Sequence, residues 1–156
     1  MSEKTFSENA RRLCREIMTR SVKTAARDTT LRETALMMRA EDVGAIPVVE
    51  DGKLVGIVTD RDIVVRAIAE GKNPETSIGD VITSEVFSVR EDDFVFTAIR
   101  LMGDKQIRRI PVVNDAGELA GIIAMADVAL ETEDEREIAE TLEDISSGAG
   151  FWKRSS

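Results

Sequence analysis

Apolar and polar positions along the chain follow a pattern that occurs twice. Residues 17–69 and 81–133 carry the two copies, and the strip Ile46-Pro47-Val48-Val49 returns 64 positions later as Ile110-Pro111-Val112-Val113. One additional residue, Ala116, then lengthens the spacing to 65. A copy of this size is close to the lower limit for burying a core alone, so the two are expected to close into a pseudo-twofold pair.

The periodicity of the first copy predicts an extended piece, a helix, two strands and a helix. Thr30-Leu-Arg-Glu33 is a capping box, which predicts a helix to about Glu41 with Leu31, Thr34, Ala35 and Met38 facing inward. Asp51-Gly52 between two apolar runs is a strong hairpin signal. The elements expected here are an extended piece at 22–24, strands at 45–49 and 54–59, and a helix from about Asp60 to Glu70 that Gly71 ends.

The second copy repeats this order, which gives an α+β fold with small sheets covered by helices. An amphipathic helix over residues 7–19 precedes the first copy, within an N-terminal segment 1–20. Asp92 or Asp93 is expected to cap the long helix of the second copy. Its other elements are a short helix at 77–82, an extended piece at 86–88, a helix to about Gly103, strands at 109–113 and 119–124, and a helix from about Ala126 past Glu140.

The composition of the chain disfavours several classes of partner and functional site. The chain of 156 residues has a net charge of −9, which disfavours nucleic acids and anionic membranes as partners. It has no histidine, which excludes histidine acid–base catalysis and makes a zinc site improbable. Cys14 is the single cysteine, so a cytoplasmic location is the simplest expectation. No apolar run approaches the roughly 18 residues of a membrane span.

The junction of a strand and a helix at Thr59 is the most distinctive motif. Gly56-Ile-Val-Thr59-Asp60-Arg61-Asp62 places a hydroxyl and a carboxylate beside unsatisfied backbone N–H groups, which suits a phosphate and a ribose. Gly56 would allow close backbone approach. The alternative is structural: Thr59 is an N-cap and Asp62 its first-turn acid. Spacing alone leaves both interpretations open.

Both copies keep the Gly and the final Asp of this motif, and here the chain resembles the tandem CBS domain pair, or Bateman module. The resemblance covers roughly residues 15–132, with repeats at 15–72 and 77–133 and an acidic helix end and tail at 134–156. It is carried by Val43-Gly-Ala-Ile-Pro-Val-Val49, Asp51–Thr59 and Asp60-Arg61-Asp62-Ile63, and by Ile107–Val113, Gly121-Ile-Ile-Ala124 and Asp127-Val128.

The resemblance implies a ligand sensor, not an enzyme, that binds AMP, ADP, ATP or S-adenosylmethionine in clefts between the repeats. Asp62 would hold the ribose hydroxyls, and Thr59 would lie by the ribose or phosphate. Aliphatic residues would sandwich the base, and Arg61 is a candidate phosphate partner, as are Lys23 and Arg108. The implied first site is Val22, Thr24, Ala45, Ile46, Pro47, Thr59, Arg61 and Asp62.

The second site departs from the family pattern. Ala124 replaces the Thr, while Asp127 is retained, so this site loses a hydroxyl and is expected to be weaker. Arg109 is its best phosphate partner, because a planar guanidinium fits a phosphate. The implied second site is Ser88, Arg109, Ile110, Pro111 and Asp127.

Three functions remain in competition. The first is the nucleotide sensor, without a prosthetic group and acting through a homodimer or an unidentified protein partner, with Mg²⁺ only alongside ATP. The second is a structural or interaction module with empty clefts. The third is a small enzyme with Mg²⁺ on Asp60, Asp62 or Asp127, which lacks a nucleophile–base pair. Phe151-Trp152 is a candidate partner contact.

Overall fold

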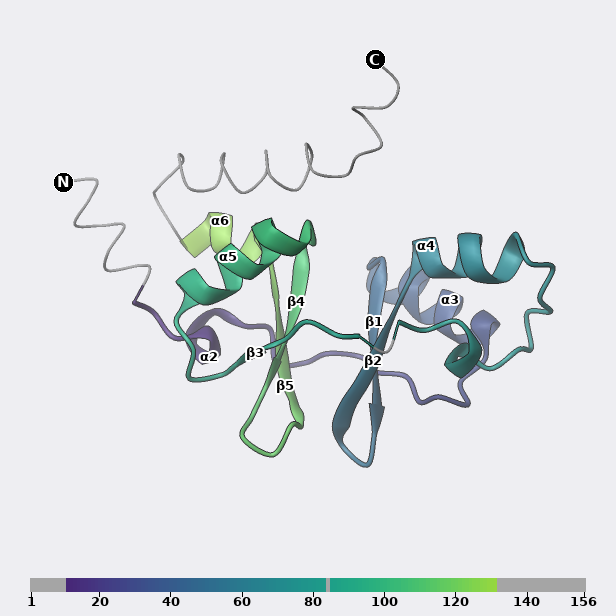
Figure 1. The fold of residues 1–156 in the computed structure, drawn as a ribbon, viewed down its shortest axis with the longest axis horizontal. Coiled ribbons are helices and arrows are strands. Elements are labelled where there is room, and N and C mark those ends of the chain that lie inside the picture. The colour runs from purple at the N-terminus through teal and green to yellow at the C-terminus, as the bar shows by residue number, and fades with distance from the viewer. Residues whose placement is uncertain (1–10, 84, 132–156) are drawn as a thin grey trace, which may run out of the picture. The chain divides into compact units, whose positions relative to one another are not determined.

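The computed structural model describes residues 11–83 and 85–131, and these divide into two units (Figure 1). The β1–β2 unit consists of Ser21–Val86 and Ala116–Leu119. Of the described residues, the β3–β5 unit contains 11–20, 87–115 and 120–131. The predicted acidic helix end and tail, with Phe151-Trp152, lie outside the described residues.

In the β1–β2 unit, two antiparallel strands pack against helices, as the periodicity predicts. The Asp51-Gly52 turn has positive φ at both residues, 52° and 80°, which matches the twist of a tight hairpin. Thr30 and Glu33 form both bonds of the capping box. The elements are α3 (Leu31–Glu41), β1 (Ala45–Glu50), β2 (Lys53–Thr59), α4 (Asp60–Asp62), the π-helix η1 (Ile63–Ile68) and the 3₁₀-helix η2 (Ile78–Asp80).

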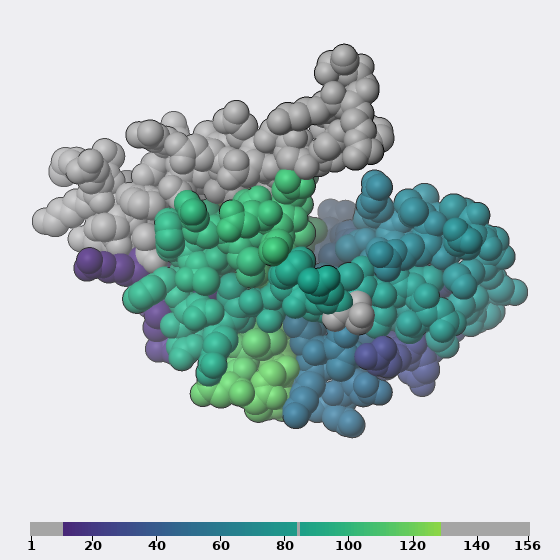
Figure 2. Space-filling model, viewed as in Figure 1, coloured from purple at the N-terminus to yellow at the C-terminus, as the bar shows by residue number. Residues whose placement is uncertain are grey.

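The helix after β2 begins as predicted at Asp60 but changes its winding. Its first turn, α4, continues into η1, where the Ala69 N–H donates to the Val64 carbonyl at 2.9 Å, a spacing of five residues. On this helix Val64, Val65 and Ile68 are 55%, 48% and 68% exposed. The blue-teal part of the chain, to which η1 belongs, forms part of the visible surface of the unit (Figure 2). Apolar periodicity for an α-helix does not reveal a π-helix.

In the β3–β5 unit, α5 and α6 lie along a three-stranded sheet of order β3-β4-β5 (Figure 1). β3 pairs parallel with β4, at Val89 with Val112. The same pairing occurs in the other unit, where Ala25 bridges Val48. The elements are α2 (Cys14–Ile17), β3 (Val89–Arg90), α5 (Val95–Lys105), β4 (Arg109–Val113), β5 (Leu119–Ala124) and α6 (Met125–Glu131).

Two predictions for this unit were wrong. The N-cap of α5 is Phe94, because the Asp93 carboxylate instead accepts a bond from the Arg90 N–H at 2.8 Å. Within the described residues, the predicted N-terminal helix is only the single turn α2. The extended piece predicted at 86–88 lies outside helices and strands and leads directly into β3, which begins at Val89.

The first residues of each sequence copy, 17–20 and 81–83, are called its lead segment. Each lead segment pairs with a strand of the other copy. Thr19, from the first copy, bridges Ile122 on β5, and Thr83, from the second copy, bridges Ile57 on β2. Cys14 and Met18 are likewise buried in the core of the β3–β5 unit. Sequence repeats and compact units therefore do not coincide. No helix in the described part of the chain is long and apolar enough to cross a membrane.

Candidate functional site

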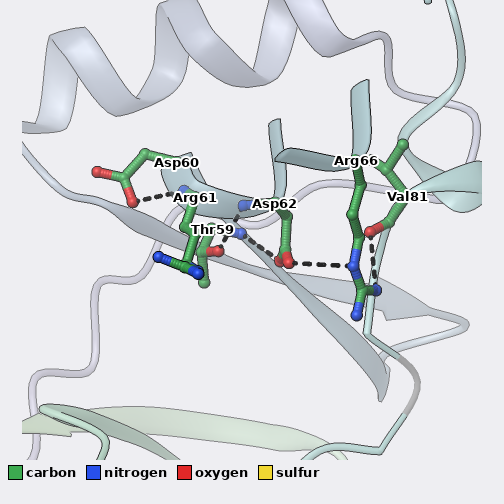
Figure 3. A network of polar contacts seen from close by, with 6 residues as sticks. All are labelled: Thr59, Asp60, Arg61, Asp62, Arg66 and Val81. Atoms are coloured by element: carbon green, nitrogen blue, oxygen red, sulfur yellow. Dashed lines mark hydrogen bonds and ion pairs between the residues drawn. The ribbon is translucent and has the colours of Figure 1, made fainter. Parts of the chain in front are cut away.

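Thr59 and Asp62 form a reciprocal pair where β2 meets α4 (Figure 3). The Thr59 N–H donates to Asp62 Oδ2 at 3.0 Å, and the Asp62 N–H donates to Thr59 Oγ1, also at 3.0 Å. The structural interpretation of this motif is therefore confirmed, since it is a capping box. It also fixes the orientation of a carboxylate whose side chain is 13% exposed.

Two charged side chains flank this pair. Arg66, one turn along, places Nε 3.8 Å from Asp62 Oδ1, and its Nη1 donates to the Val81 carbonyl at 3.5 Å (Figure 3). The sequence interpretation missed Arg66, although its spacing of four residues from Asp62 is a signal for such an ion pair. Asp60 accepts a bond from the Arg61 N–H at 2.8 Å and lies against Gly44.

The second copy has half of the capping box. The Ala124 N–H donates to Asp127 Oδ2 at 3.1 Å, as its counterpart Thr59 does to Asp62. Alanine has no hydroxyl to accept a bond from the Asp127 N–H. The substitution noticed in the sequence therefore removes one defined bond while the carboxylate keeps its position relative to β5.

The predicted wall residues differ in burial. Ala45 is half-buried and pairs with Thr59 across the hairpin, which brings these two site residues together. Ile46 and Ile110 are 1% and 0% exposed and belong to the cores, so only their backbone can reach a ligand. Pro47 and Pro111 are also buried, Val22, Thr24, Ser88, Arg109 and Asp127 are half-buried, and Arg61 and Arg108 are exposed.

The glycine of each motif leaves space that another segment of the chain occupies. A Cβ on Gly56 would lie 2.8 Å from Ile82 Cδ1 and 3.2 Å from the Thr83 carbonyl oxygen. A Cβ on Gly121 would lie 2.7 Å from the Thr19 carbonyl oxygen. The close backbone approach expected at Gly56 is thus made by the exchanged lead segment.

Cys14 lies in the core of the β3–β5 unit. Cys14 is fully buried, and burial, followed by the charge of Asp93, raises the pKa of its thiol to about 12. The thiol is therefore protonated at neutral pH. Within residues 11–83 and 85–131, no three His, Cys, Asp or Glu side chains gather closely enough to hold a metal ion.

Several known proteins are similar to this chain in sequence or in structure. The YhcV protein of Bacillus subtilis (strain 168), a CBS domain-containing protein, is 38% identical over 132 residues, which are 85% of this chain and 94% of YhcV. Two solved structures are also similar. One is the CBS domain pair of MJ0100 with 5′-methylthioadenosine and S-adenosyl-L-methionine, at TM-score 0.68 and 28% identity, covering 76% of this chain and 94% of that one.

The other is CBSX2 in complex with AMP, at TM-score 0.68 and 25% identity, covering 76% of this chain and 93% of CBSX2. The family model for the CBS domain matches residues 14–68 and again residues 78–134. These two matches span the two sequence copies and include both Gly…Asp motifs. The chain therefore belongs to the CBS domain family and carries two CBS domains in tandem.

Proposed function

We propose that this chain is a non-catalytic regulatory protein that binds an adenosine-type ligand, namely AMP, ADP, ATP or S-adenosylmethionine. The observation that carries the proposal is the oriented Asp62 carboxylate in α4, which directly follows Thr59 at the end of β2. The ligands of the MJ0100 and CBSX2 structures support it, since all of them contain adenosine.

The capping box leaves groups available for such a ligand. Asp62 Oδ2 accepts the Thr59 N–H, while Oδ1 faces Arg66 at the longer distance of 3.8 Å. The carboxylate thus keeps lone pairs for two vicinal ribose hydroxyls. The Thr59 hydroxyl accepts the Asp62 N–H and still has its own proton to donate to a phosphate oxygen. Ala124 has no such proton to offer in the second copy, so the second site is proposed to be weaker.

Occupancy is proposed to act through a homodimer or a protein partner. Val64, Val65 and Ile68 form an exposed apolar face on η1, which follows the ligand-binding turn directly. A ligand that binds one arrangement of this region more tightly than another shifts the population toward that arrangement. Mg²⁺ would take part only together with ATP, through its phosphates.

The first test removes the charge of Asp62 and leaves the cap in place. Asp62→Asn keeps a side-chain oxygen for the Thr59 N–H, so the fold is expected to persist. At a ligand concentration 100 times Kd, the wild type should gain about 2.7 kcal/mol. This corresponds to about 5–10 °C in Tm for a chain of this size. Asp62→Asn should lose most of this gain.

Calorimetry and thermal shift with adenosine, AMP, ATP and S-adenosylmethionine provide the measurement. Asp127→Asn is the matched control, because it changes the corresponding carboxylate of the second copy and should leave the stronger response intact. Adding the missing hydroxyl by Ala124→Thr should tighten the second, weaker binding event. A normal response of Asp62→Asn would show that the first site is assigned wrongly.

The alternative is an interaction module that binds no nucleotide. One observation favours it: Thr59 and Asp62 already satisfy each other, which is a sufficient structural reason for both residues. This alternative predicts that none of the four ligands stabilises the wild-type protein. A response to any of them, abolished in Asp62→Asn, would exclude it.

A further inference from the structure

The Arg66 side chain connects two parts of the β1–β2 unit that are separated in sequence. Its Nε lies 3.8 Å from Asp62 Oδ1, and its Nη1 donates to the Val81 carbonyl at 3.5 Å (Figure 3). A guanidinium presents several N–H groups in one rigid plane, so a single side chain can face both acceptors. Arg66 thus lies between the proposed ribose-binding carboxylate and the backbone after η2.

The segment that contains Val81 is held firmly within its unit. Val81 is 2% exposed, and the next residue, Ile82, fills the space beside Gly56. Thr83 then exchanges two backbone hydrogen bonds of 3.3 Å with Ile57 on β2. The Val81 carbonyl is therefore held in place and gives the Arg66 guanidinium a second acceptor besides Asp62.

The second copy lacks this arginine. The residue 65 positions after Arg66 is Glu131, four residues beyond Asp127. A glutamate side chain has no N–H group that could donate to a carboxylate. The copies therefore differ at this position as well as at Thr59/Ala124.

We propose that Arg66 is a positioning residue for the first site, one that orients the Asp62 carboxylate for the ribose without touching the ligand. This inference rests on the proposed nucleotide function. Thr59 restrains the Oδ2 edge of the carboxylate and Arg66 restrains the Oδ1 edge. Arg66 Nε faces Asp62 and Nη1 faces the Val81 carbonyl, so both nitrogens have acceptors within the protein. A phosphate-binding arginine would instead direct them toward the ligand.

Calorimetry of Arg66→Gln with adenosine and with AMP tests the assignment. A positioning role acts through the ribose, which both ligands share, so both affinities should fall by the same factor. We expect about 1.4- to fivefold, which corresponds to the roughly 0.2–1 kcal/mol of an exposed ion pair. Arg66→Glu, which copies the second repeat, should lose more, because two carboxylates then face each other.

Arg39→Gln is the matched control, since it removes the same charge from an exposed position on α3. It should leave both affinities within error of the wild type. A loss with AMP alone would overturn the proposal, because it would make Arg66 a phosphate contact. Unchanged affinities in Arg66→Gln would overturn it as well.

A measurement without ligand separates this inference from the proposed function. In the NMR spectrum of the free protein, Arg66→Gln should shift the Thr59 amide proton, which reports its bond to Asp62, and the Val81 carbonyl carbon. Arg39→Gln should shift neither. If the wild type binds neither adenosine nor AMP, the nucleotide function fails and the positioning of a ligand-binding carboxylate fails with it. If binding is normal but these two signals do not move, only the role of Arg66 is wrong.

Discussion

At the scale of single residues, Cys14 shows how burial changes the chemistry of a side chain. Its thiol is 0% exposed and lies 3.6 Å from the Phe94 carbonyl oxygen, to which it donates. Burial, together with the charge of Asp93, raises the pKa of the thiol from 9.0 to about 12. The thiolate is the nucleophile, so Cys14 should resist alkylation while the protein is folded.

The same shift predicts a pH dependence of stability. Above pH 9 the unfolded chain releases the thiol proton while the folded chain keeps it, so the folded state becomes less stable as pH rises toward about 12. At pH 10 the Cys14 contribution should be about 1.4 kcal/mol less favourable than at pH 7. Urea denaturation at both pH values gives the measurement. Cys14→Ala is the reference, and an equal loss in that variant would show that other groups cause the effect.

At the scale of elements, the two motif glycines allow a lead segment to lie against a strand. Thr19 and Ile122 exchange backbone bonds of 2.8 and 3.0 Å, so the Thr19 carbonyl beside Gly121 cannot move without losing them. At Gly56 the nearest obstacle is the end of the Ile82 side chain, which can turn aside. Overpacking generally costs about 1–3 kcal/mol. Gly121→Ala should therefore lie near the upper end of this range and Gly56→Ala near the lower.

Urea denaturation followed by circular dichroism compares these two variants directly. They make the same chemical change at matched positions of the two copies, so each serves as the control for the other. Equal losses of stability would mean that the type of neighbouring atom, backbone or flexible side chain, does not set the cost. A larger loss of stability in Gly56→Ala than in Gly121→Ala would contradict the prediction, because the more rigid contact would then lie at Gly56.

Elements that depend on local chemistry could be predicted from the sequence. The Thr30–Glu33 box and the Asp51-Gly52 hairpin involve only neighbouring residues, and both were predicted correctly. The cap and first-turn acid at Thr59 and Asp62 were one of the two interpretations that the spacing left open, and the structure confirms this one. The CBS resemblance, drawn from two copies in register, is also confirmed.

Features that depend on distant contacts could not be predicted. Asp93 binds the Arg90 N–H instead of capping α5, a choice between two local partners that the sequence does not reveal. The Arg66 contact to Val81 spans fifteen residues, and the neighbour of Gly56 comes from the other sequence copy. In the last two cases the deciding interaction depends on how distant segments pair, which the periodicity of the sequence does not contain.

At the scale of the whole chain, the exchange of lead segments determines which unit a substitution destabilises. The Thr19 N–H donates to the Ile122 carbonyl at 2.8 Å, whereas the Thr83 N–H donates to the Ile57 carbonyl at 3.3 Å. Proline removes the N–H at either position. Thr19→Pro, in the first sequence copy, should therefore destabilise the β3–β5 unit, and Thr83→Pro, in the second copy, should destabilise the β1–β2 unit.

Hydrogen exchange with mass spectrometry resolves this crossed pattern, because local opening is measured segment by segment. In Thr19→Pro, protection should fall in β5 and α5 and persist in β1 and β2, and Thr83→Pro should show the reverse. Division of the chain at its sequence repeats predicts the opposite assignment for both variants. Loss of protection confined to the copy that carries the substitution would thus refute the exchange. The crossed result would mean that each lead segment stabilises the strands of the other copy, so the two CBS repeats cannot be separated between residues 72 and 77 without leaving both units incomplete.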